Sequence, residues 1–391
     1  MIDPLQTYIW AEIERMLARG DVPDGLRRED LSTPALLVDL NSLDANIAKM
    51  AAYCRERGLA LRPHGKTHKC PEIAHALVRA GAVGCCAARI SEAEAFAQHG
   101  VTGLLVTTAV IGRHKIERAV RLAEAQPGTI FSVDDTQNTE DLNDAAGAAG
   151  IRLELAIDLW IGARTGIASG EPALALAQQI DSLPHLHLAG LQAYAAPASH
   201  VTGWEERRVF SRRAMICAVE TRRLLEAHGI ECPLVTGGST GTYNIDSEVE
   251  GVTELQPGSF LFMDMDYRSI GGKGGDAVYR DFEPSLSVWT TVVSKPSREL
   301  AIVDGGYKAF STDRQFPPEA KTMRGLAYSW GGDEHGKLTL SGAEEPVNVG
   351  DRIEFLVPHC DPTVNLYDRI FGLRGDRVES VWRIAARGMS Q

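Results

Sequence analysis

The sequence predicts an α/β protein, a (β/α)8 barrel followed by an antiparallel β-domain. Between residues 61 and 258, short apolar or β-branched runs alternate with segments that have helical spacing. Past residue 275 the helical pattern ends, and β-rich runs are separated by Gly and Pro turns. The length of 391 residues accommodates a barrel and a smaller domain. A doubly wound open sheet produces the same local pattern and is the alternative.

The first elements precede the barrel pattern. Residues 5–19 have the spacing of an amphipathic helix and are followed by a glycine. Residues 34–40 predict a strand, and Asn41 is placed to cap a helix that reaches about residue 57. Leu43, Ile47 and Met50 form the apolar stripe of that helix.

Eight strands are predicted for the barrel, and helices are predicted between them. The strands fall at 61–65, 84–89, 104–110, 130–133, 153–159, 188–194, 234–238 and 254–258. Helical segments include 71–80, 91–99, 114–125, 171–182 and 205–228. Most positions in such strands are apolar or β-branched because parallel strands in a barrel bury both faces. The strands of the β-domain are predicted at 286–293, 300–304, 337–340, 352–357 and 378–384.

Composition and charge limit the class of protein. Hydrophobic residues make up 44% and charged residues 24%, and no run approaches the roughly 18–20 apolar residues of a spanning helix. The N-terminus lacks a signal-peptide pattern, so a cytoplasmic protein without membrane contact is expected. The net charge of −12 disfavours nucleic-acid binding. Seven scattered cysteines indicate reduced thiols rather than a disulfide framework.

A His/Lys-rich stretch, Leu-Arg-Pro-His-Gly-Lys-Thr-His-Lys at 61–69, is the first candidate site. In an extended chain His64, Lys66 and His68 would share one face, with Thr67 and Lys69 on the other. A lysine in a water-poor site can lose its proton and attack a carbonyl carbon, as in the anchoring of pyridoxal phosphate. A solvated basic loop is the simpler alternative.

A glycine- and hydroxyl-rich run follows the seventh predicted strand. Gly237-Gly238-Ser239-Thr240-Gly241-Thr242 offers unobstructed backbone N–H groups, and Gly258 and Ser259 come one strand later. In barrels the loops after strands 7 and 8 commonly bind phosphate, so these residues predict a phosphate site. By itself such a run also suits a flexible turn.

Three further polar residues are predicted at the same rim. Arg164 lies between two glycines after the fifth strand and could bind a phenolate or a carboxylate. Tyr194 ends the sixth strand, and His200, six residues on, is a candidate general base. A surface ion pair for the arginine and a solvated loop histidine are the alternatives.

His359 and Asp361 are the candidate metal ligands. They end a strand of the β-domain, and in an extended chain they would face the same way. An imidazole with a carboxylate suits Mn²⁺, Mg²⁺ or Zn²⁺ and leaves coordination positions for water or substrate. Cys360 would face away, and a polar turn without a metal is the alternative.

Four motifs in this order resemble the metal-activated, fold-type III pyridoxal-phosphate enzymes, which include D-threonine aldolase, 3-hydroxy-D-aspartate aldolase and D-serine dehydratase. They are His-Gly-Lys-Thr-His-Lys at 64–69, Gly-Ala-Arg-Thr-Gly at 162–166, Gly-Gly-Ser-Thr-Gly-Thr at 237–242 and His-Cys-Asp-Pro-Thr at 359–363. The resemblance runs from about residue 30 to 388. It implies an alanine-racemase-like barrel over 41–272, a β-domain formed by 1–40 and 273–391, and a homodimer.

The resemblance also implies a role for each candidate residue. Lys66 would bind pyridoxal 5′-phosphate covalently, and Arg164 would contact its phenolic oxygen. Tyr194 would lie near its ring, and His200 would be the base. The phosphate would be bound by Gly238, Ser239, Thr240, Gly258 and Ser259. The metal ligands would be His359 and Asp361.

The activity that the resemblance implies is cleavage of a small-molecule D-β-hydroxy-α-amino acid, D-threonine or 3-hydroxy-D-aspartate, to glycine and an aldehyde. The alternative is a dehydratase that releases ammonia and a 2-oxo acid. Members that dehydrate resemble His-x-Cys at the metal, whereas the aldolases resemble His-x-Asp, and this chain has His359-Cys360-Asp361. The sequence therefore favours a carbon–carbon lyase.

Two further questions concern the class of protein and the substrate. A noncatalytic pyridoxal-phosphate carrier resembles only the barrel, so residues 275–391 argue against that class. Arg268, Lys308 and Arg314 are cations that could receive a second substrate carboxylate, although a surface charge is the favoured interpretation of each.

Overall fold

The computed structural model describes residues 4–162 and 164–391, with the side chains from residue 9 onward. The first three residues, part of the N-terminal segment without a signal-peptide pattern, lie outside the described chain. Two compact units are present. The β-unit comprises 1–46, 261–268 and 281–387, and the barrel unit comprises 47–260, 269–280 and 388–391.

The barrel unit contains eight parallel strands in the order β2-β9-β8-β7-β6-β5-β4-β3. Their bounds are β2 (Ala60–Leu61), β3 (Cys85–Ala87), β4 (Leu104–Val106), β5 (Ile130–Val133), β6 (Leu153–Asp158), β7 (Leu186–Ala193), β8 (Leu234–Gly237) and β9 (Glu254–Leu255). A parallel bridge between His64 and Cys86 joins the two ends of the sheet. The predicted barrel is therefore confirmed, and the open-sheet alternative is wrong.

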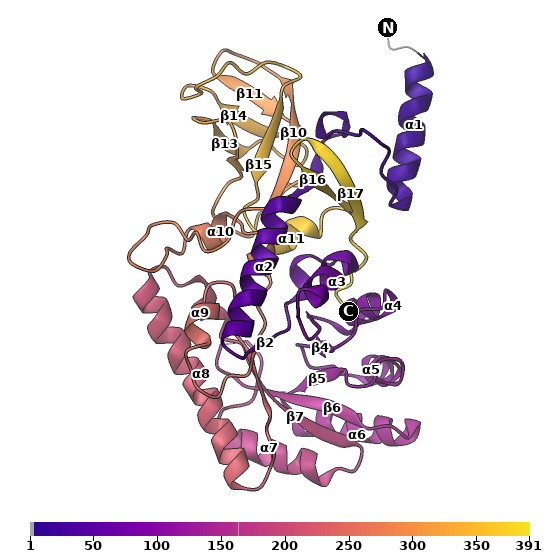
Figure 1. Cartoon of the computed structure of the whole chain (residues 1–391), viewed down its shortest axis with the longest axis vertical. Coiled ribbons are helices and arrows are strands. Elements are labelled where there is room, and N and C mark those ends of the chain that lie inside the picture. Colours follow the sequence, from indigo (N-terminus) through magenta and orange to yellow (C-terminus); the bar gives the residue numbers. More distant parts are fainter. Residues whose placement is uncertain (1–3, 163) are drawn as a thin grey trace. The chain divides into compact units, whose positions relative to one another are not determined.

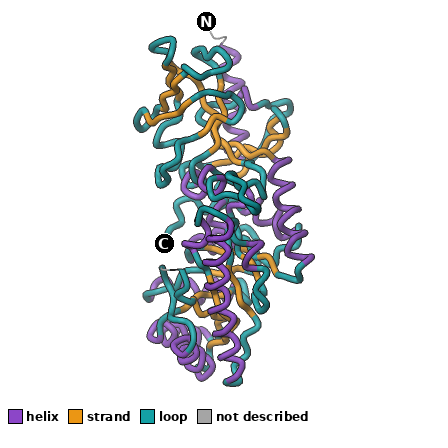
Figure 2. The backbone as a smooth tube through the Cα atoms, turned by 90° about the vertical axis from the view of Figure 1, so that its left-hand side faces the viewer, coloured by secondary structure: helices purple, strands orange, loops and turns teal. Residues whose placement is uncertain are grey.

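Helices alternate with these strands, as the apolar spacing predicts. They are α2 (Leu40–Glu56), α3 (Pro71–Arg79), α4 (Ile90–Gln98), α5 (Arg113–Ala125), α6 (Thr136–Ala149), α7 (Glu171–Ser182), α8 (Trp204–Ala227) and the short α9 (Tyr243–Asp246). Figure 2 shows the helices in purple outside the strands in orange in this unit. The cap of α2 differs from the prediction, because the Asp39 carboxylate, not Asn41, accepts the Ser42 N–H at 3.0 Å.

A buried ion pair crosses the barrel interior. The Arg62 guanidinium donates from Nε and Nη2 to the two Glu254 oxygens at 2.9 Å each. Thr236 Oγ1 donates to Glu254 at 2.7 Å, and Gln256 Nε2 donates to Thr236 at 2.9 Å. Because both charges are paired and hydrogen-bonded, the pair is tolerated in the interior and ties the ends of β2, β8 and β9 together.

The β-unit is built on a nine-stranded sheet (Figure 1). Its strands are β1 (Ala35–Asp39), β10 (Leu286–Ser294), β11 (Leu300–Val303), β12 (Glu319–Ala320), β13 (Ala327–Trp330), β14 (Gly336–Thr339), β15 (Arg352–Leu356), β16 (Arg369–Arg374) and β17 (Arg377–Arg383). All pairings are antiparallel except that of β1 with β16. The predicted antiparallel domain is thus confirmed, and β12, β13 and β16 lie outside the predicted strands.

The N-terminal segment belongs to this sheet. Strand β1 lies between β10 and β16, so residues from both ends of the chain share one core. Helix α1 (Pro4–Arg19) contributes Leu17 to that core, and two short helices, α10 (Met265–Arg268) and α11 (Cys360–Val364), complete the unit. No helix in the described part of the chain combines the length and the hydropathy needed to cross a membrane.

Candidate functional site

A cavity of about 290 Å³ lies at the carboxyl ends of the barrel strands. Three predicted site residues, Lys66, Arg164 and Tyr194, line it together. The other lining residues are His64, Ala88, Arg89, Thr107, Thr108, Asp158, Gly162, Thr165, Gln192 and Gln256. The carboxyl end of a barrel is where loops from many strands converge, so distant sequence segments meet here.

The turn that carries Lys66 is a 3₁₀ helix over Gly65–Thr67, not the extended chain that was predicted. The Lys66 N–H donates to His64 Nδ1 at 3.3 Å, and this contact starts the turn. A Cβ on Gly65 would lie 2.5 Å from the Phe96 ring, so only glycine fits there. The predicted alternation of faces over 64–69 is therefore wrong, because a helical turn does not have a period of two.

The neighbours of Lys66 have separate environments. With Nδ1 accepting, His64 is assigned as the tautomer that carries its proton on Nε2, which lies 3.2 Å from Thr107 Oγ1. His68 is fully buried and accepts the Cys70 N–H at 3.1 Å. Lys69 Nζ donates to the buried carboxylate of Glu92 at 2.7 Å. Of the two lysines, Lys66 is the one that lines the cavity.

Asp158, at the end of β6, forms hydrogen bonds with other residues that line the cavity. Its carboxylate accepts hydrogen bonds from Gln192 Nε2 at 2.9 Å and from Thr165 Oγ1 at 2.7 Å. Burial raises the pKa of Asp158, while these hydrogen bonds and the charge of Arg164 oppose the rise. The Arg164 guanidinium carbon lies 5.1 Å from the centre of the Tyr194 ring. Asp158 therefore connects β7 to the loop that presents Arg164.

The buried carboxylate of Asp246 anchors the glycine-rich loop after β8 through hydrogen bonds. The Ser239 N–H donates to Thr242 Oγ1 at 3.1 Å, and Thr242 Oγ1 donates to Asp246 at 2.6 Å. Ser211 Oγ donates to the other Asp246 oxygen at 2.5 Å. Burial raises the pKa of Asp246 to about 6. Gly238 has a φ of +79°, which a residue with a side chain rarely adopts.

Two buried hydroxyls lie on the turn that carries Lys66 and on the glycine-rich loop after β8. Thr67 Oγ1 and Thr240 Oγ1 are buried, and no hydrogen-bond partner for either is present among the described residues. A Cβ on Gly258 would lie 2.4 Å from Thr67 Oγ1, so the loop after β9 lies against the Lys66 turn. Ser259 begins the 3₁₀ helix Ser259–Leu261. Buried donors without partners are costly unless a ligand accepts from them, so these residues fit an oxyanion.

His200 ends a 3₁₀ helix over Ala196–His200. The carbonyl oxygen of the preceding residue, Ser199, lies 2.4 Å from where a Cβ on Gly241 would be. The structure therefore places His200 beside the glycine-rich loop. His200 is not one of the described residues that line the 290 Å³ cavity.

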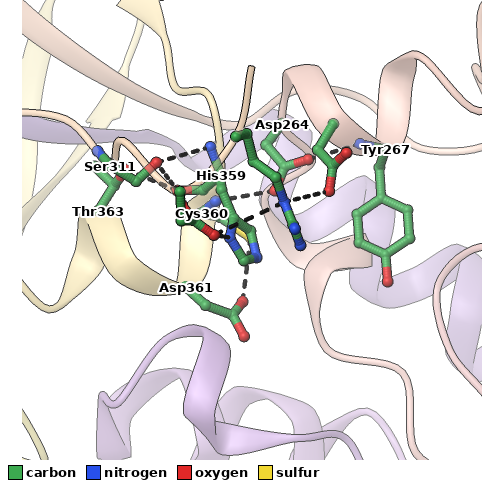
Figure 3. Close-up of polar contacts among 10 residues, drawn as sticks. Asp264, Tyr267, Ser311, His359, Cys360, Asp361 and Thr363 are labelled. Carbon is green, nitrogen blue, oxygen red and sulfur yellow. Dashed lines mark hydrogen bonds and ion pairs between the residues drawn. The ribbon is translucent and has the colours of Figure 1, made fainter. Parts of the chain in front are cut away.

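The second candidate site lies within the β-unit, around His359 (Figure 3). His359 precedes α11, and its N–H donates to Ser311 Oγ at 3.1 Å. Thr363 Oγ1 donates to the His359 carbonyl at 2.7 Å, and the Cys360 N–H donates to Asp264 at 2.9 Å. Burial raises the pKa of Asp264, and the charge of His359 acts against this rise. The main chain at His359 is thus anchored on both sides.

The imidazole of His359 is oriented by a carboxylate. Its Nδ1 lies 2.7 Å from Asp313 Oδ2, and this contact leaves Nε2 as the other ring nitrogen that a ligand could approach. Asp361 is the second residue of α11, so the predicted same-face geometry of an extended chain is wrong. Within residues 4–162 and 164–391 no group of three or more His, Cys, Asp or Glu side chains is arranged to hold a metal.

Comparison with known proteins agrees with this architecture. Residues 38–266 match the alanine racemase N-terminal domain, and residues 285–373 match a putative serine dehydratase domain. A D-threonine aldolase from Arthrobacter sp. is 37% identical, with 94% of this chain and 95% of the relative covered. The chain belongs to the D-threonine aldolase-like family of fold-type III pyridoxal-phosphate enzymes. The predicted family membership is confirmed.

Two other aldolases and one dehydratase refine the comparison. A 3-hydroxy-D-aspartate aldolase from Paracoccus denitrificans (strain Pd 1222) is 35% identical over 94% of this chain and 96% of its own. The crystal structure of D-threonine aldolase from Filomicrobium marinum has a TM-score of 0.90 at 36% identity, covering 94% and 99%. A D-threo-3-hydroxyaspartate dehydratase from Delftia sp. (strain HT23) is 28% identical over 90% and 97%. The aldolases are thus more similar to this chain than that dehydratase.

In this aldolase-like chain, the cations that were considered for a second substrate carboxylate are all ion-paired. Arg314 Nε lies 2.7 Å from Asp266, Lys308 pairs with Glu334, and Arg268 lies 3.6 Å from Glu319.

Arg89 was not predicted, yet it lines the barrel cavity and is exposed. No hydrogen bond or ion pair of the Arg89 side chain is found with the residues that the structure describes. Its position at the end of the second predicted strand, 84–89, was the available signal.

Proposed function

We propose that the protein is a pyridoxal 5′-phosphate- and divalent-metal-dependent aldolase. It would cleave D-β-hydroxy-α-amino acids of the D-threonine or 3-hydroxy-D-aspartate type to glycine and an aldehyde. The main support is the meeting of Lys66, Arg164 and Tyr194 in one cavity of a chain whose relatives include aldolases of both types. This activity is that of a carbon–carbon lyase.

Bound pyridoxal phosphate supplies an electron sink for the pair released when the Cα–Cβ bond breaks. Lys66 is proposed as the amine that attaches the cofactor, because it lines the cavity. Arg164 would donate to the phenolic oxygen, and Tyr194 would pack near the ring. The phosphate would be held by the partnerless hydroxyl of Thr240 together with Gly238, Ser239, Gly258 and Ser259.

In the β-unit we propose His359 and Asp361 as ligands of Mn²⁺, Mg²⁺ or Zn²⁺. The carboxylate of Asp313 behind the His359 ring supports this, since it fixes the ring orientation and raises the basicity of the nitrogen that would bind. Such an ion supplies Lewis acidity toward a hydroxyl group. His200 is proposed to accept the proton of the substrate β-hydroxyl.

Arg89 is proposed to receive a substrate carboxylate. It is exposed two residues after the end of β3, and it lines the same cavity as Lys66. Lys66 and Arg164 are assigned to the cofactor, and Asp158 is hydrogen-bonded to Gln192 and Thr165. Arg89 is therefore the lining cation that these assignments leave for a carboxylate.

The products distinguish the two possible reactions. Purified enzyme would be incubated with D-threonine and with 3-hydroxy-D-aspartate in the presence of Mn²⁺ or Mg²⁺. Glycine with acetaldehyde or glyoxylate is expected. Release of ammonia and a 2-oxo acid without glycine would instead show that the enzyme is a dehydratase. Glycine formation that continues in the presence of a chelator would show that the reaction does not need the metal. Homodimeric assembly and a cytoplasmic location stay predictions.

A further inference from the structure

Arg207 belongs to α8, and its side chain is completely buried, with an exposed fraction of 0%. A guanidinium is costly to bury, because its charge and its five N–H groups all lose contact with water. The cost is offset only where protein groups accept hydrogen bonds from those N–H groups. The acceptors around Arg207 therefore indicate what this side chain does.

The N–H groups of Arg207 donate to main-chain carbonyl oxygens of three loops in the barrel unit. Nε donates to Gly241 in the glycine-rich loop at 2.9 Å, and Nη1 donates to Val201 in the preceding loop at 2.8 Å. Nη1 also donates to Ile270, and Nη2 donates to Gly271, each at 2.8 Å. One side chain thus joins the glycine-rich loop to two other loops of the same unit.

The three loops are in close contact where Arg207 joins them. A Cβ on Gly241 would lie 2.4 Å from the Ser199 carbonyl oxygen and 2.9 Å from Ile270 Cδ1. The Gly203 N–H donates to the Ile270 carbonyl at 3.0 Å. A displacement of any one loop would therefore break its hydrogen bonds with Arg207 or its contacts with the other two.

Arg207 also fixes the turn of the glycine-rich loop. The carbonyl and the N–H of a trans peptide group point in opposite directions, so the bond to the Gly241 carbonyl directs the Thr242 N–H away from Arg207. The Thr242 N–H donates to the Ser239 carbonyl at 3.2 Å, which closes a four-residue turn. The conformation of residues 239–242 is thus supported by a side chain of α8.

Tyr279 makes the corresponding contact one peptide group earlier. It is buried, and its hydroxyl donates to the Thr240 carbonyl at 2.6 Å, so the Gly241 N–H points to the other side of the loop. No hydrogen bond of the Thr240 or Gly241 N–H is found with the residues that the structure describes. Two such successive N–H groups suit an oxyanion. The Arg207 guanidinium carbon lies 5.8 Å from the centre of the Tyr279 ring, so the two side chains support the loop together.

We propose that Arg207 is a positioning residue for the cofactor phosphate. It holds the Gly241 carbonyl and so keeps the N–H groups of the loop in the orientation that the phosphate needs, without touching the phosphate itself. A site whose donors are already oriented binds its ligand without the cost of ordering the loop. The inference rests on the proposed function in one respect, the assignment of the phosphate of pyridoxal 5′-phosphate to the glycine-rich loop.

The test compares pyridoxal 5′-phosphate with pyridoxal, which lacks the phosphate. The full-length protein, freed of cofactor, is titrated with each compound, and the dissociation constant is measured from the visible absorbance. Arg207→Lys replaces a fork of five N–H groups by an ammonium with three, so the three loops cannot all be held. The dissociation constant for pyridoxal 5′-phosphate is expected to rise by about 10-fold or more, while that for pyridoxal stays within about 2-fold of the wild type.

Tyr279→Phe is the second variant, because it removes the hydrogen bond to the Thr240 carbonyl and retains the ring. It should raise the dissociation constant for pyridoxal 5′-phosphate by about 3- to 10-fold and leave that for pyridoxal unchanged. The matched control is Arg223→Lys, the same substitution at an exposed position of α8, which should change neither constant. Circular dichroism and thermal unfolding verify that each variant is folded, and if Arg207→Lys is not folded, Tyr279→Phe decides the test.

Two results with the folded variants would overturn the proposal. One is binding of pyridoxal 5′-phosphate as tight as in the wild type, and the other is an equal loss of affinity for pyridoxal, which would show a general disturbance of the cavity. A wild type that binds both compounds equally well would contradict the phosphate assignment and this role of Arg207 with it. A wild type that binds neither compound would instead contradict the proposed function itself.

Discussion

The barrel cavity and the His359 centre differ in how completely the protein shapes them. In the cavity, residues from six strands or the loops after them converge, and Asp158, Gln192, Thr107 and His64 are tied by hydrogen bonds. At His359 the main chain is anchored equally well, but the metal donors proposed are only one imidazole and one carboxylate. A cofactor that is attached covalently to Lys66 and held in a formed pocket, as proposed, should stay bound. A metal ion held by two protein ligands should exchange with the solvent.

The largest effect is expected at Lys66. Lys66→Ala removes the amine that attaches the cofactor, so turnover should fall by about 10⁴-fold or more, on the scale seen when a covalent nucleophile is removed. The visible absorbance of the bound cofactor should disappear as well, measured after dialysis and by mass spectrometry after borohydride reduction. The matched control is Lys69→Arg, which preserves the ion pair with Glu92 and should keep the colour. A covalent adduct in Lys66→Ala would show that the wrong lysine was assigned.

His359→Ala should separate the two sites. Loss of the imidazole is expected to lower activity by about 10²-fold or more while the cofactor absorbance stays, because the barrel cavity is untouched. Dialysis of the wild type against a chelator should mimic the variant, and added Mn²⁺ or Mg²⁺ should restore the wild type only. Asp313→Asn should weaken metal binding by about 10–100-fold, measured by titration calorimetry. If the enzyme kept full activity after treatment with a chelator, the proposed metal requirement at His359 would be contradicted.

Arg89→Gln should affect the substrate and not the cofactor. The loss of one charge-assisted hydrogen bond is expected to raise KM by about 10–100-fold, with cofactor absorbance unchanged. A rise in KM for 3-hydroxy-D-aspartate alone would show that Arg89 binds the side-chain carboxylate of that substrate. An equal rise in KM for D-threonine would show that Arg89 binds the α-carboxylate. Lys308→Ala, at an exposed pair with Glu334, is the control and should leave both KM values unchanged. Unchanged KM values in Arg89→Gln would exclude both assignments.

The last effect concerns stability and pH and leaves turnover aside. Asp246 has its pKa raised from 3.8 to about 6, so the folded state binds this proton more tightly than the unfolded state. Its contribution therefore favours folding at low pH and is lost as pH rises from about 4 to about 6, a difference on the order of 3 kcal/mol. Asp246→Asn lacks this contribution. The wild type should thus gain stability relative to the variant as pH falls, measured by urea unfolding at pH 4.5 and 7.5. Parallel pH profiles for the two proteins would contradict the assignment.

The barrel could be predicted because buried parallel strands have a local signature. Runs such as 104–110 and 153–159 are apolar or β-branched at most of their positions, which few other structures require. The pairing of β1 with β16 could not be predicted, since it joins residues more than 300 positions apart and has no local pattern. The three strands that were missed include β12, which is only two residues long.

The candidate site was predictable in its residues more than in its geometry. Lys66 and Arg164 follow predicted strands, Tyr194 ends one, and all three line the cavity. The turn at Gly65–Thr67 was missed because it depends on the side chain of His64 accepting a local N–H. Asp246, below the glycine-rich loop, was also missed, since its contact with Ser211 on α8 exists only in the folded chain. Asp313 behind His359 is a contact of the same kind.

The position of β1 within the β-unit has a consequence for the order in which the chain folds during synthesis. Residues 47–260 of the barrel unit are contiguous and leave the ribosome before β10 is made. Strand β1 emerges earlier still, but its partners begin at residues 286 and 369, so it has no ladder to join for most of translation. We expect the barrel to become protease-resistant on the nascent chain first, while residues 35–39 stay cleavable until the last strands are released.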